Sequence, residues 1–162
     1  MLLGLNARMT EFNAALALAG LDLVPAKVAT HNGIAALYTA KLDGTPGIAF
    51  QRLPPGHLSS YKDYSVRVDP AAFGMTRDEL AVALLKENIE TKKYFHPPLH
   101  QQNLFRPFAT ADLVHLPVTE AVAESVLSLP IYASLPAETV RQVAWAIRGL
   151  SQPVRKQGAG AW

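Results

Sequence analysis

One stretch of the sequence constrains the fold more than any other, because it predicts a long helix with a single apolar face. Apolar side chains recur there at spacings of three and four residues, at Val24, Val28, Ala35, Tyr38 and Leu42. This repeat predicts a helix over residues 25–42 whose apolar face lies in a core. Gly33 costs such a helix about 1 kcal/mol relative to alanine, which predicts a bend or a packing contact that excludes a side chain. The turn cluster at residues 43–47 ends the helix.

Shorter elements are predicted on both sides of this helix. They comprise a helix at 10–18, strands at 48–51 and 64–69, a helix at 76–87, an extended segment at 89–95, a loop at 96–112, a helix at 119–126, an edge strand at 127–132 and a helix at 136–148. Thr76 and Glu79 form the sequence pattern of a capping box, which fixes one helix start, and Thr10 and Thr119 are expected to cap two other helices. Gly20 is expected to interrupt the first helix and Gly149 to end the last one. The residues expected to face inward are Leu80, Leu84 and Leu85 in the helix at 76–87, and Val140, Val143, Ala144 and Ile147 in the helix at 136–148. Pro130 cannot donate to a ladder, which indicates an edge strand. The order predicts an α+β fold, a mainly antiparallel sheet with helices on one face.

Composition narrows the class of protein. The chain has 162 residues, 49% hydrophobic and 17% charged, which is typical of one globular domain. The net charge is only +2 and its cations are scattered, so we expect no nucleic-acid partner. Cysteine is absent, which excludes disulfides and thiolate metal sites. No apolar run approaches the roughly 20 residues that span a bilayer, so we expect no membrane contact and a cytoplasmic protein.

Two polar residues precede the first predicted helix, where backbone N–H groups and the helix dipole favour anions. The Asn6 amide can donate to a phosphate oxygen there, or it is an ordinary turn asparagine. The Arg8 guanidinium either contacts a phosphate-bearing ligand or forms an ion pair with Glu11, three residues on.

A second candidate segment is the proline-stiffened loop at residues 94–100. The prolines at 97 and 98 hold Tyr94 and His100 at fixed positions, so both are candidates for substrate contacts. His96 and His100 are four residues apart, but the prolines between them exclude the helical geometry that would make this spacing a metal site. We therefore expect no metal. The sequence also contains no serine-nucleophile elbow and no glycine-rich nucleotide loop.

These segments resemble a known family. Residues 4–15, G-L-N-A-R-M-T-E-F-N-A-A, are similar to the G-x-N-x-[RK]-M-[ST]-E-x-x-A-A element of the DegT/DnrJ-type nucleotide-sugar aminotransferases, which depend on pyridoxal phosphate (PLP). Residues 90–100, E-T-K-K-Y-F-H-P-P-L-H, are similar to the family's T-R-x-Y-F-x-P-P-L-H segment, with Lys92 in place of the usual arginine. Further matches at 24–42, 46–48, 73–80 and 126–132 follow the family's order, so the resemblance covers residues 4 to about 150.

The resemblance implies a fold and an activity. The chain would be the small C-terminal domain of a fold-type I PLP transferase at residues 24–150, preceded by a remnant of the large-domain and dimer-interface segment at 1–23 and followed by a flexible tail at 151–162. The parent enzyme would transfer an amino group from glutamate to a keto-sugar attached to a nucleotide. Asn6 would contact the PLP phosphate of a neighbouring subunit. Arg8, Tyr94 and His100 would contact substrate, with His100 at the mouth of the active site.

The resemblance also predicts what the chain lacks. None of its seven lysines has the family's motif around the lysine that binds PLP, so we expect a C-terminal part without the Schiff-base residue and without catalytic activity of its own. Its partners would be a second copy or a complementing large domain, and the Ala-rich first helix would then leave an apolar patch that promotes association. Three alternatives remain open: a non-catalytic dimerisation or interaction module, a free-standing domain that binds nucleotide sugars, and a truncated gene product.

Overall fold

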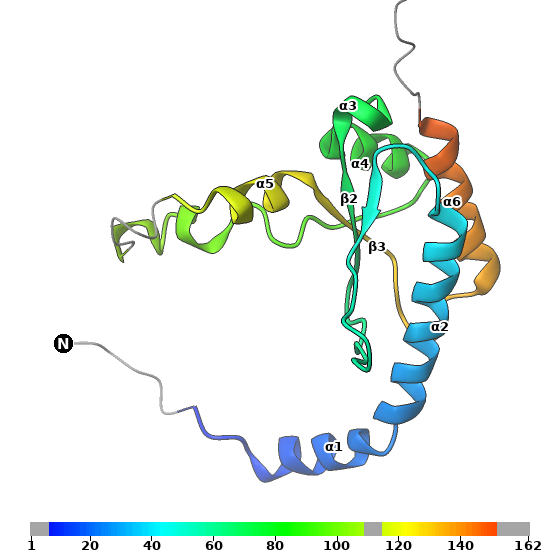
Figure 1. The fold of residues 1–162 in the computed structure, drawn as a ribbon. Helices are drawn as coiled ribbons and strands as arrows, with labels where there is room; N and C mark the ends of the chain where they lie inside the picture. Colours follow the sequence, from blue (N-terminus) through cyan, green and yellow to red (C-terminus); the bar gives the residue numbers. More distant parts are fainter. Residues whose placement is uncertain (1–6, 109–114, 152–162) are drawn as a thin grey trace, which may run out of the picture.

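The protein folds into the predicted α+β arrangement of a small antiparallel sheet and helices (Figure 1). The computed structural model describes residues 7–108 and 115–151. Its elements are α1 (Glu11–Leu21), α2 (Val24–Leu42), β1 (Ile48–Phe50), β2 (Tyr64–Val68), α3 (Pro70–Phe73), α4 (Arg77–Lys86), η1 (Leu99–Gln101), η2 (Arg106–Phe108), α5 (Pro117–Ser125), β3 (Val126–Leu129) and α6 (Ala137–Leu150).

The sheet has the strand order β1-β2-β3, and both pairs are antiparallel. Alternation along β2 buries Tyr64, Val66 and Val68 on one face and leaves Arg67 exposed on the other. On that other face Ser65 and Ser128 lie opposite each other, and their hydroxyl oxygens are 2.7 Å apart. The outer edge of β3 receives a single β-bridge from Lys92. The sheet therefore has one apolar face and needs a layer of helices over it.

Helices α2 and α6 supply that layer and lie side by side (Figure 1). Tyr38 and Leu42 of α2 are fully buried, and Tyr38 stacks on Tyr64 with ring centroids 5.1 Å apart. The Tyr38 hydroxyl donates to the carbonyl of Pro130 at 3.0 Å, so the long helix is tied to the chain after β3. Burial raises the pKa of Tyr64 to about 12. The apolar face predicted for α6 is also confirmed, since Val140, Val143, Ala144 and Ile147 are buried.

Helix α1 stands apart from this core. Thr10 caps it as predicted, accepting a hydrogen bond from the backbone N–H of Asn13 at 3.2 Å. None of its residues is buried, and Phe12 and Leu16 are 73% and 58% exposed. No single helix in the described ranges is long and apolar enough to cross a membrane; α1 and α2 reach that length and composition only together, bent by 58°.

Several predicted boundaries were wrong for physical reasons. Gly20 and Gly149 lie inside α1 and α6, since a single glycine weakens a helix without ending it. Helix α5 begins at Pro117, a residue suited to a first turn, and Thr119 is not its cap. Leu85, expected to face inward, is 61% exposed, because the side of α4 that faces the core carries Leu80 and Leu84.

Candidate functional site

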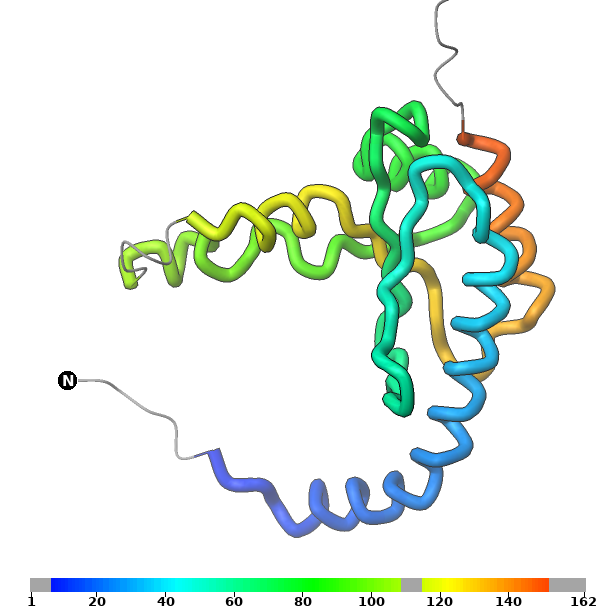
Figure 2. The backbone as a smooth tube through the Cα atoms, in the orientation of Figure 1, coloured from blue at the N-terminus to red at the C-terminus, as the bar shows by residue number. Residues whose placement is uncertain are grey.

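The proline-rich loop belongs to a long projection that we call the arm, residues 93–108 and 115–125. The chain leaves the β-bridge at Lys92, runs outward through η1 and η2, and returns as α5 into β3. The arm and α1 project to the same side of the core in this view (Figure 2). The segment predicted as a loop therefore contains two short 3-10 turns, and its residues 109–114 lie outside the described ranges.

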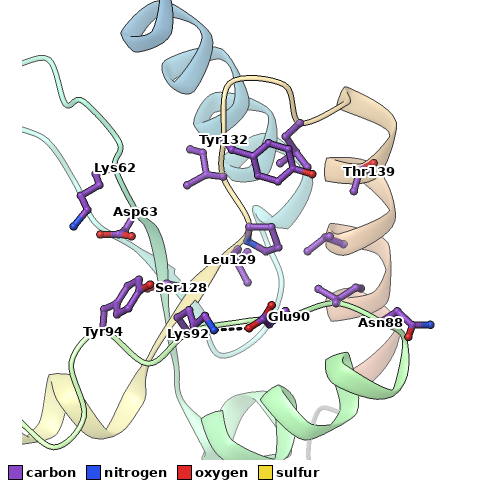
Figure 3. Close-up of a pocket in the computed structure, with 15 residues that line it drawn as sticks. Lys62, Asp63, Asn88, Glu90, Lys92, Tyr94, Ser128, Leu129, Tyr132 and Thr139 are labelled. Carbon is purple, nitrogen blue, oxygen red and sulfur yellow. Dashed lines mark hydrogen bonds and ion pairs between the residues drawn. The ribbon is translucent and has the colours of Figure 1, made fainter. Parts of the chain in front are cut away.

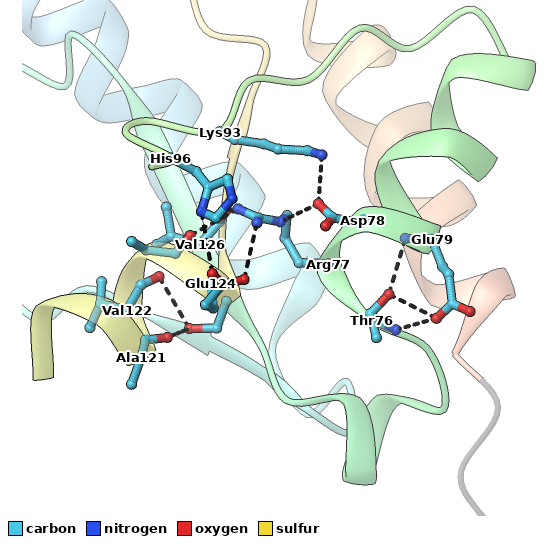
Figure 4. A network of polar contacts seen from close by, with 12 residues as sticks. Thr76, Arg77, Asp78, Glu79, Lys93, His96, Ala121, Val122, Glu124 and Val126 are labelled. Carbon is cyan, nitrogen blue, oxygen red and sulfur yellow. Dashed lines mark hydrogen bonds and ion pairs between the residues drawn. The ribbon is translucent and has the colours of Figure 1, made fainter. Parts of the chain in front are cut away.

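A buried arginine fastens the arm to the core (Figure 4). Arg77, the first residue of α4, is only 2% exposed. Its Nη1 donates to the backbone carbonyls of Ala123 and Val126, both at 3.0 Å. These carbonyls lie where α5 ends and β3 begins, so one side chain fixes the point at which the arm rejoins the sheet.

Acidic residues surround this guanidinium. Its Nε lies 2.6 Å from Oδ1 of Asp78, an ion pair without the alignment of a hydrogen bond, and its Nη2 lies 4.0 Å from Oε2 of Glu124. Lys93 also pairs with Asp78, and its hydrogen bond is the main reason why the pKa of that carboxyl is lowered. His96 Nδ1 lies 3.6 Å from Oε1 of Glu124. Both ends of the arm are thus held by charges at the start of α4.

Farther from the core, His100 and Glu120 connect η1, in the outgoing segment of the arm, to α5, in the returning segment. Nε2 of His100, on η1, lies 3.1 Å from Oε1 of Glu120, on α5. The same oxygen accepts the backbone N–H of Leu116 at 3.0 Å, and Oε2 lies 3.7 Å from Nδ1 of His115. The His100 side chain is only 9% exposed, whereas His115 is open to solvent. The Leu116 and His100 hydrogen bonds, in that order, lower the pKa of Glu120.

Tyr94 lies at a different place, in a pocket of about 400 Å³ between the base of the arm, β3 and the start of α6 (Figure 3). Its polar lining includes Lys62, Asp63, Glu90, Lys92, Tyr94 and Tyr132. Lys92 and Glu90 form an ion pair with each other. Tyr94 is 40% exposed, so its ring is available to a ligand in this pocket.

The remaining predicted site residues lie near the amino terminus. Asn6 lies outside the described residues. Arg8 is exposed ahead of α1, and within the described ranges it forms no ion pair with Glu11. The structure thus places Tyr94 in the pocket beside β3 and His100 beside Glu120, with Arg8 exposed ahead of α1. No group of three or more possible metal ligands lies in the part of the chain that the structure covers.

The arm also carries an apolar surface beside these polar groups. A pocket of about 720 Å³ lies between η1 and α5, lined by Phe95, Pro98, Leu99, Gln102, Val118, Thr119, Val122 and Ala123. Phe95 and Val118 are 68% and 77% exposed. Helix α1 adds further exposed apolar side chains, among them Phe12 and Leu16.

Sequence reasoning missed two residues of this region, Arg77 and Glu120. Arg77 lies between the two residues of the capping box, where the sequence predicts only an ordinary residue of the first helical turn. Glu120 follows the predicted cap Thr119, where the sequence predicts only an acidic side chain that interacts favourably with the helix dipole. Their roles depend on contacts 46 and 20 residues away in sequence, to Ala123 and His100, which no local pattern contains.

Known proteins share this arrangement. Over 149 residues the chain is 34% identical to dTDP-4-amino-4,6-dideoxy-D-glucose transaminase of Escherichia coli, an alignment covering 90% of the chain and 39% of that enzyme. The crystal structure of DesI in the presence of its TDP-sugar product is 31% identical, with a TM-score of 0.81 over 91% of the chain and 37% of DesI. DesV of S. venezuelae, in complex with a ketimine intermediate, is 28% identical, with a TM-score of 0.82 over 94% of the chain and 39% of DesV.

The chain thus spans less than two fifths of the length of each of these relatives. Residues 1–148, which include the opening segment, the core and the arm, match one family along nearly the whole chain. By this match the chain belongs to the DegT/DnrJ/EryC1/StrS aminotransferase family.

Proposed function

We propose that this chain is the C-terminal part of a PLP-dependent aminotransferase that acts on a nucleotide-linked keto-sugar in amino-sugar biosynthesis. One observation carries the proposal: the family match covers about nine tenths of the chain but less than two fifths of its relatives. Residues 24–150 would be the small domain, residues 1–23 a segment of the large-domain and dimer interface, and residues 151–162 a tail.

The lysines that the structure describes lack the surroundings expected of an amine that binds PLP covalently. An amine that forms a Schiff base is activated by burial or by a neighbouring cation, which lowers its pKa. The described lysines are all exposed: Lys27, Lys41, Lys62, Lys86, Lys92 and Lys93. Lys92 lines the pocket near Tyr94, but its hydrogen bond to Glu90 raises its pKa and keeps it charged. This supports a reactive lysine in another part of the enzyme, and no chemical step is assigned to these amines.

The contribution of the chain would be to bind and orient. Asn6 would hold the PLP phosphate of a neighbouring subunit, and Arg8, Tyr94 and His100 would contact the nucleotide sugar or the glutamate donor. Tyr94 lines the pocket beside β3, whereas His100 pairs with Glu120 on α5, and this separation supports a site that other parts of the enzyme complete. The exposed apolar faces of α1 and the arm fit the same role, since burial against a large domain or a second copy would stabilise them.

The test is a fusion in which this chain replaces the matching C-terminal region of the E. coli transaminase. The fusion should transfer amino groups between glutamate and the dTDP-sugar of that enzyme, while the chain alone should not. His100→Ala should lower the activity of the fusion, and His57→Ala, a histidine that is exposed and outside the arm, is the matched control. Activity of the chain alone would refute the proposal, as would equal activity of the two histidine variants.

A second function, that of a non-catalytic interaction module, is favoured by one observation: α1 buries none of its residues. A module of this kind would bind its partner through α1 and would need neither Tyr94 nor His100. Co-purification with a large domain that survives His100→Ala, without any restored transfer activity, would favour this reading.

A further inference from the structure

We propose that Glu120 is a positioning residue that holds the His100 ring through Nε2 and leaves Nδ1 as a hydrogen-bond acceptor for a hydroxyl group of the sugar substrate. The biological meaning of this inference rests on the proposed function, whereas its geometry is a property of this chain alone.

The Glu120 carboxylate is held at the start of α5. Glu120 lies in the first turn of α5, and its Oε1 accepts the backbone N–H of Leu116 at 3.0 Å. This bond, together with the helix dipole, fixes the carboxylate in its ionised form at the start of the helix. An ionised carboxylate has no proton to donate, so it can only accept hydrogen bonds. The lowered pKa of Glu120 agrees with this state.

The protonation of the ring nitrogens follows. Because Glu120 accepts, the nitrogen 3.1 Å from its Oε1 must be the donor, and that nitrogen is Nε2 of His100. A neutral imidazole carries one N–H, so Nδ1 is then the acceptor. Among the described residues Nδ1 of His100 makes no hydrogen bond.

The surroundings separate His100 from the other histidines of the arm. Its side chain is 9% exposed, while those of His96 and His115 are 33% and 77% exposed, and both lie farther from their carboxylates, at 3.6 and 3.7 Å. Only His100 thus combines burial with hydrogen-bond distance. An Nδ1 that accepts suits a hydroxyl donor and disfavours the fully ionised diphosphate bridge of a nucleotide sugar, which has no proton to donate.

The geometry can be tested by NMR of the ¹⁵N-labelled chain at about pH 8, where an unperturbed imidazole is neutral. We expect a low-field N–H proton on His100, assigned to Nε2, that exchanges slowly with water. Glu120→Ala should abolish this signal. Glu124→Ala, which removes the carboxylate one turn later on the same helix, should preserve it. A proton on Nδ1, or a signal that survives Glu120→Ala, would overturn the inference.

Glu120→Ala also removes the hydrogen bond to Leu116 at the start of α5, so a second variant is needed as a control. Glu120→Gln keeps an oxygen that can accept from both Leu116 and His100 but removes the charge, so the proton should remain and move upfield. An unchanged chemical shift of the His100 N–H proton would count against an ionised Glu120 carboxylate as its acceptor.

In the fusion enzyme, a positioning role of Glu120 predicts a change in KM for the nucleotide sugar. Glu120→Ala should raise KM for the nucleotide sugar roughly tenfold, equal to about 1.4 kcal/mol, while Glu124→Ala leaves KM unchanged. An equal effect of both variants would contradict a positioning role. An inactive fusion would refute the proposed function and leave the NMR result on the geometry of His100 to stand by itself.

Discussion

At the scale of single residues, Gly47 shows how closely the sheet and α3 approach each other. Its φ is +74°, and a Cβ built there would lie 2.4 Å from the backbone nitrogen of Phe73 and 2.7 Å from the carbonyl oxygen of Asp69. The Gly47 carbonyl also accepts the N–H of Asp69 at 2.8 Å, so the backbones cannot separate without losing this bond. A side chain at this position is therefore excluded.

Gly47→Ala should lower the free energy of unfolding by about 3 kcal/mol or more, since overpacking adds to the cost of a left-handed backbone. Gly44→Ala is the matched control, because Gly44 has a similar φ of +71° with nothing within 4 Å of the added Cβ. It should cost only about 1–2 kcal/mol. Urea unfolding followed by circular dichroism measures both, and equal costs would disprove the close approach.

Arg77 gives the second prediction at this scale. Arg77→Met removes the donor for two carbonyls, those of Ala123 and Val126, and should cost about 3 kcal/mol in unfolding free energy. Arg141→Met removes an exposed arginine that pairs only with Glu138 on its own helix, and should cost less than about 0.5 kcal/mol. Hydrogen exchange in α5 should also rise only in the Arg77 variant. Unchanged protection of α5 would show that this arginine does not hold the arm.

At the scale of elements, α1 and α4 begin with the same kind of cap but have different surroundings. Thr10 and Thr76 each accept a backbone N–H three residues on, both at 3.2 Å. Helix α4 buries Leu80 and Leu84 in the core, while α1 buries nothing. Thr76→Ala should therefore lower the stability of the core by about 1 kcal/mol. Thr10→Ala should leave the main unfolding transition unchanged; a comparable loss would mean that α1 folds with the core.

The same contrast explains what the sequence could predict. The helix of residues 24–42, the capping box and the apolar face of α6 depend on local repeats, and all three are confirmed. The end of β3 after Leu129 was placed less well, because strand pairing depends on distant partners. The start of α5 at Pro117 was missed although proline is a local signal that suits a first helical turn.

The candidate site was predictable only in part, for a related reason. The proline-stiffened loop predicted Tyr94 and His100 as site residues. It could not predict that Tyr94 lines a pocket beside β3, whereas His100 pairs with Glu120 on α5. The fold assignment came from the order of motifs along the chain. The partners of each side chain came from tertiary structure alone.

At the scale of the whole molecule, the exposed apolar face of α1 predicts association of the isolated chain. Sedimentation equilibrium should detect dimers or larger species whose fraction rises with concentration. Phe12→Ser combined with Leu16→Gln should shift the population to monomers without changing core stability. Val82→Gln, at a site 57% exposed on α4, is the matched control and should not alter association. A monomeric parent chain at high concentration would contradict this account.

We propose that the amine that would bind PLP lies outside these 162 residues. The most direct measurement is titration of the purified chain with PLP, followed by borohydride reduction and mass mapping of the labelled lysines. We predict no saturable absorbance band and only sparse labelling spread over the exposed lysines. Stoichiometric reduction of PLP onto a single lysine of this chain would contradict the claim.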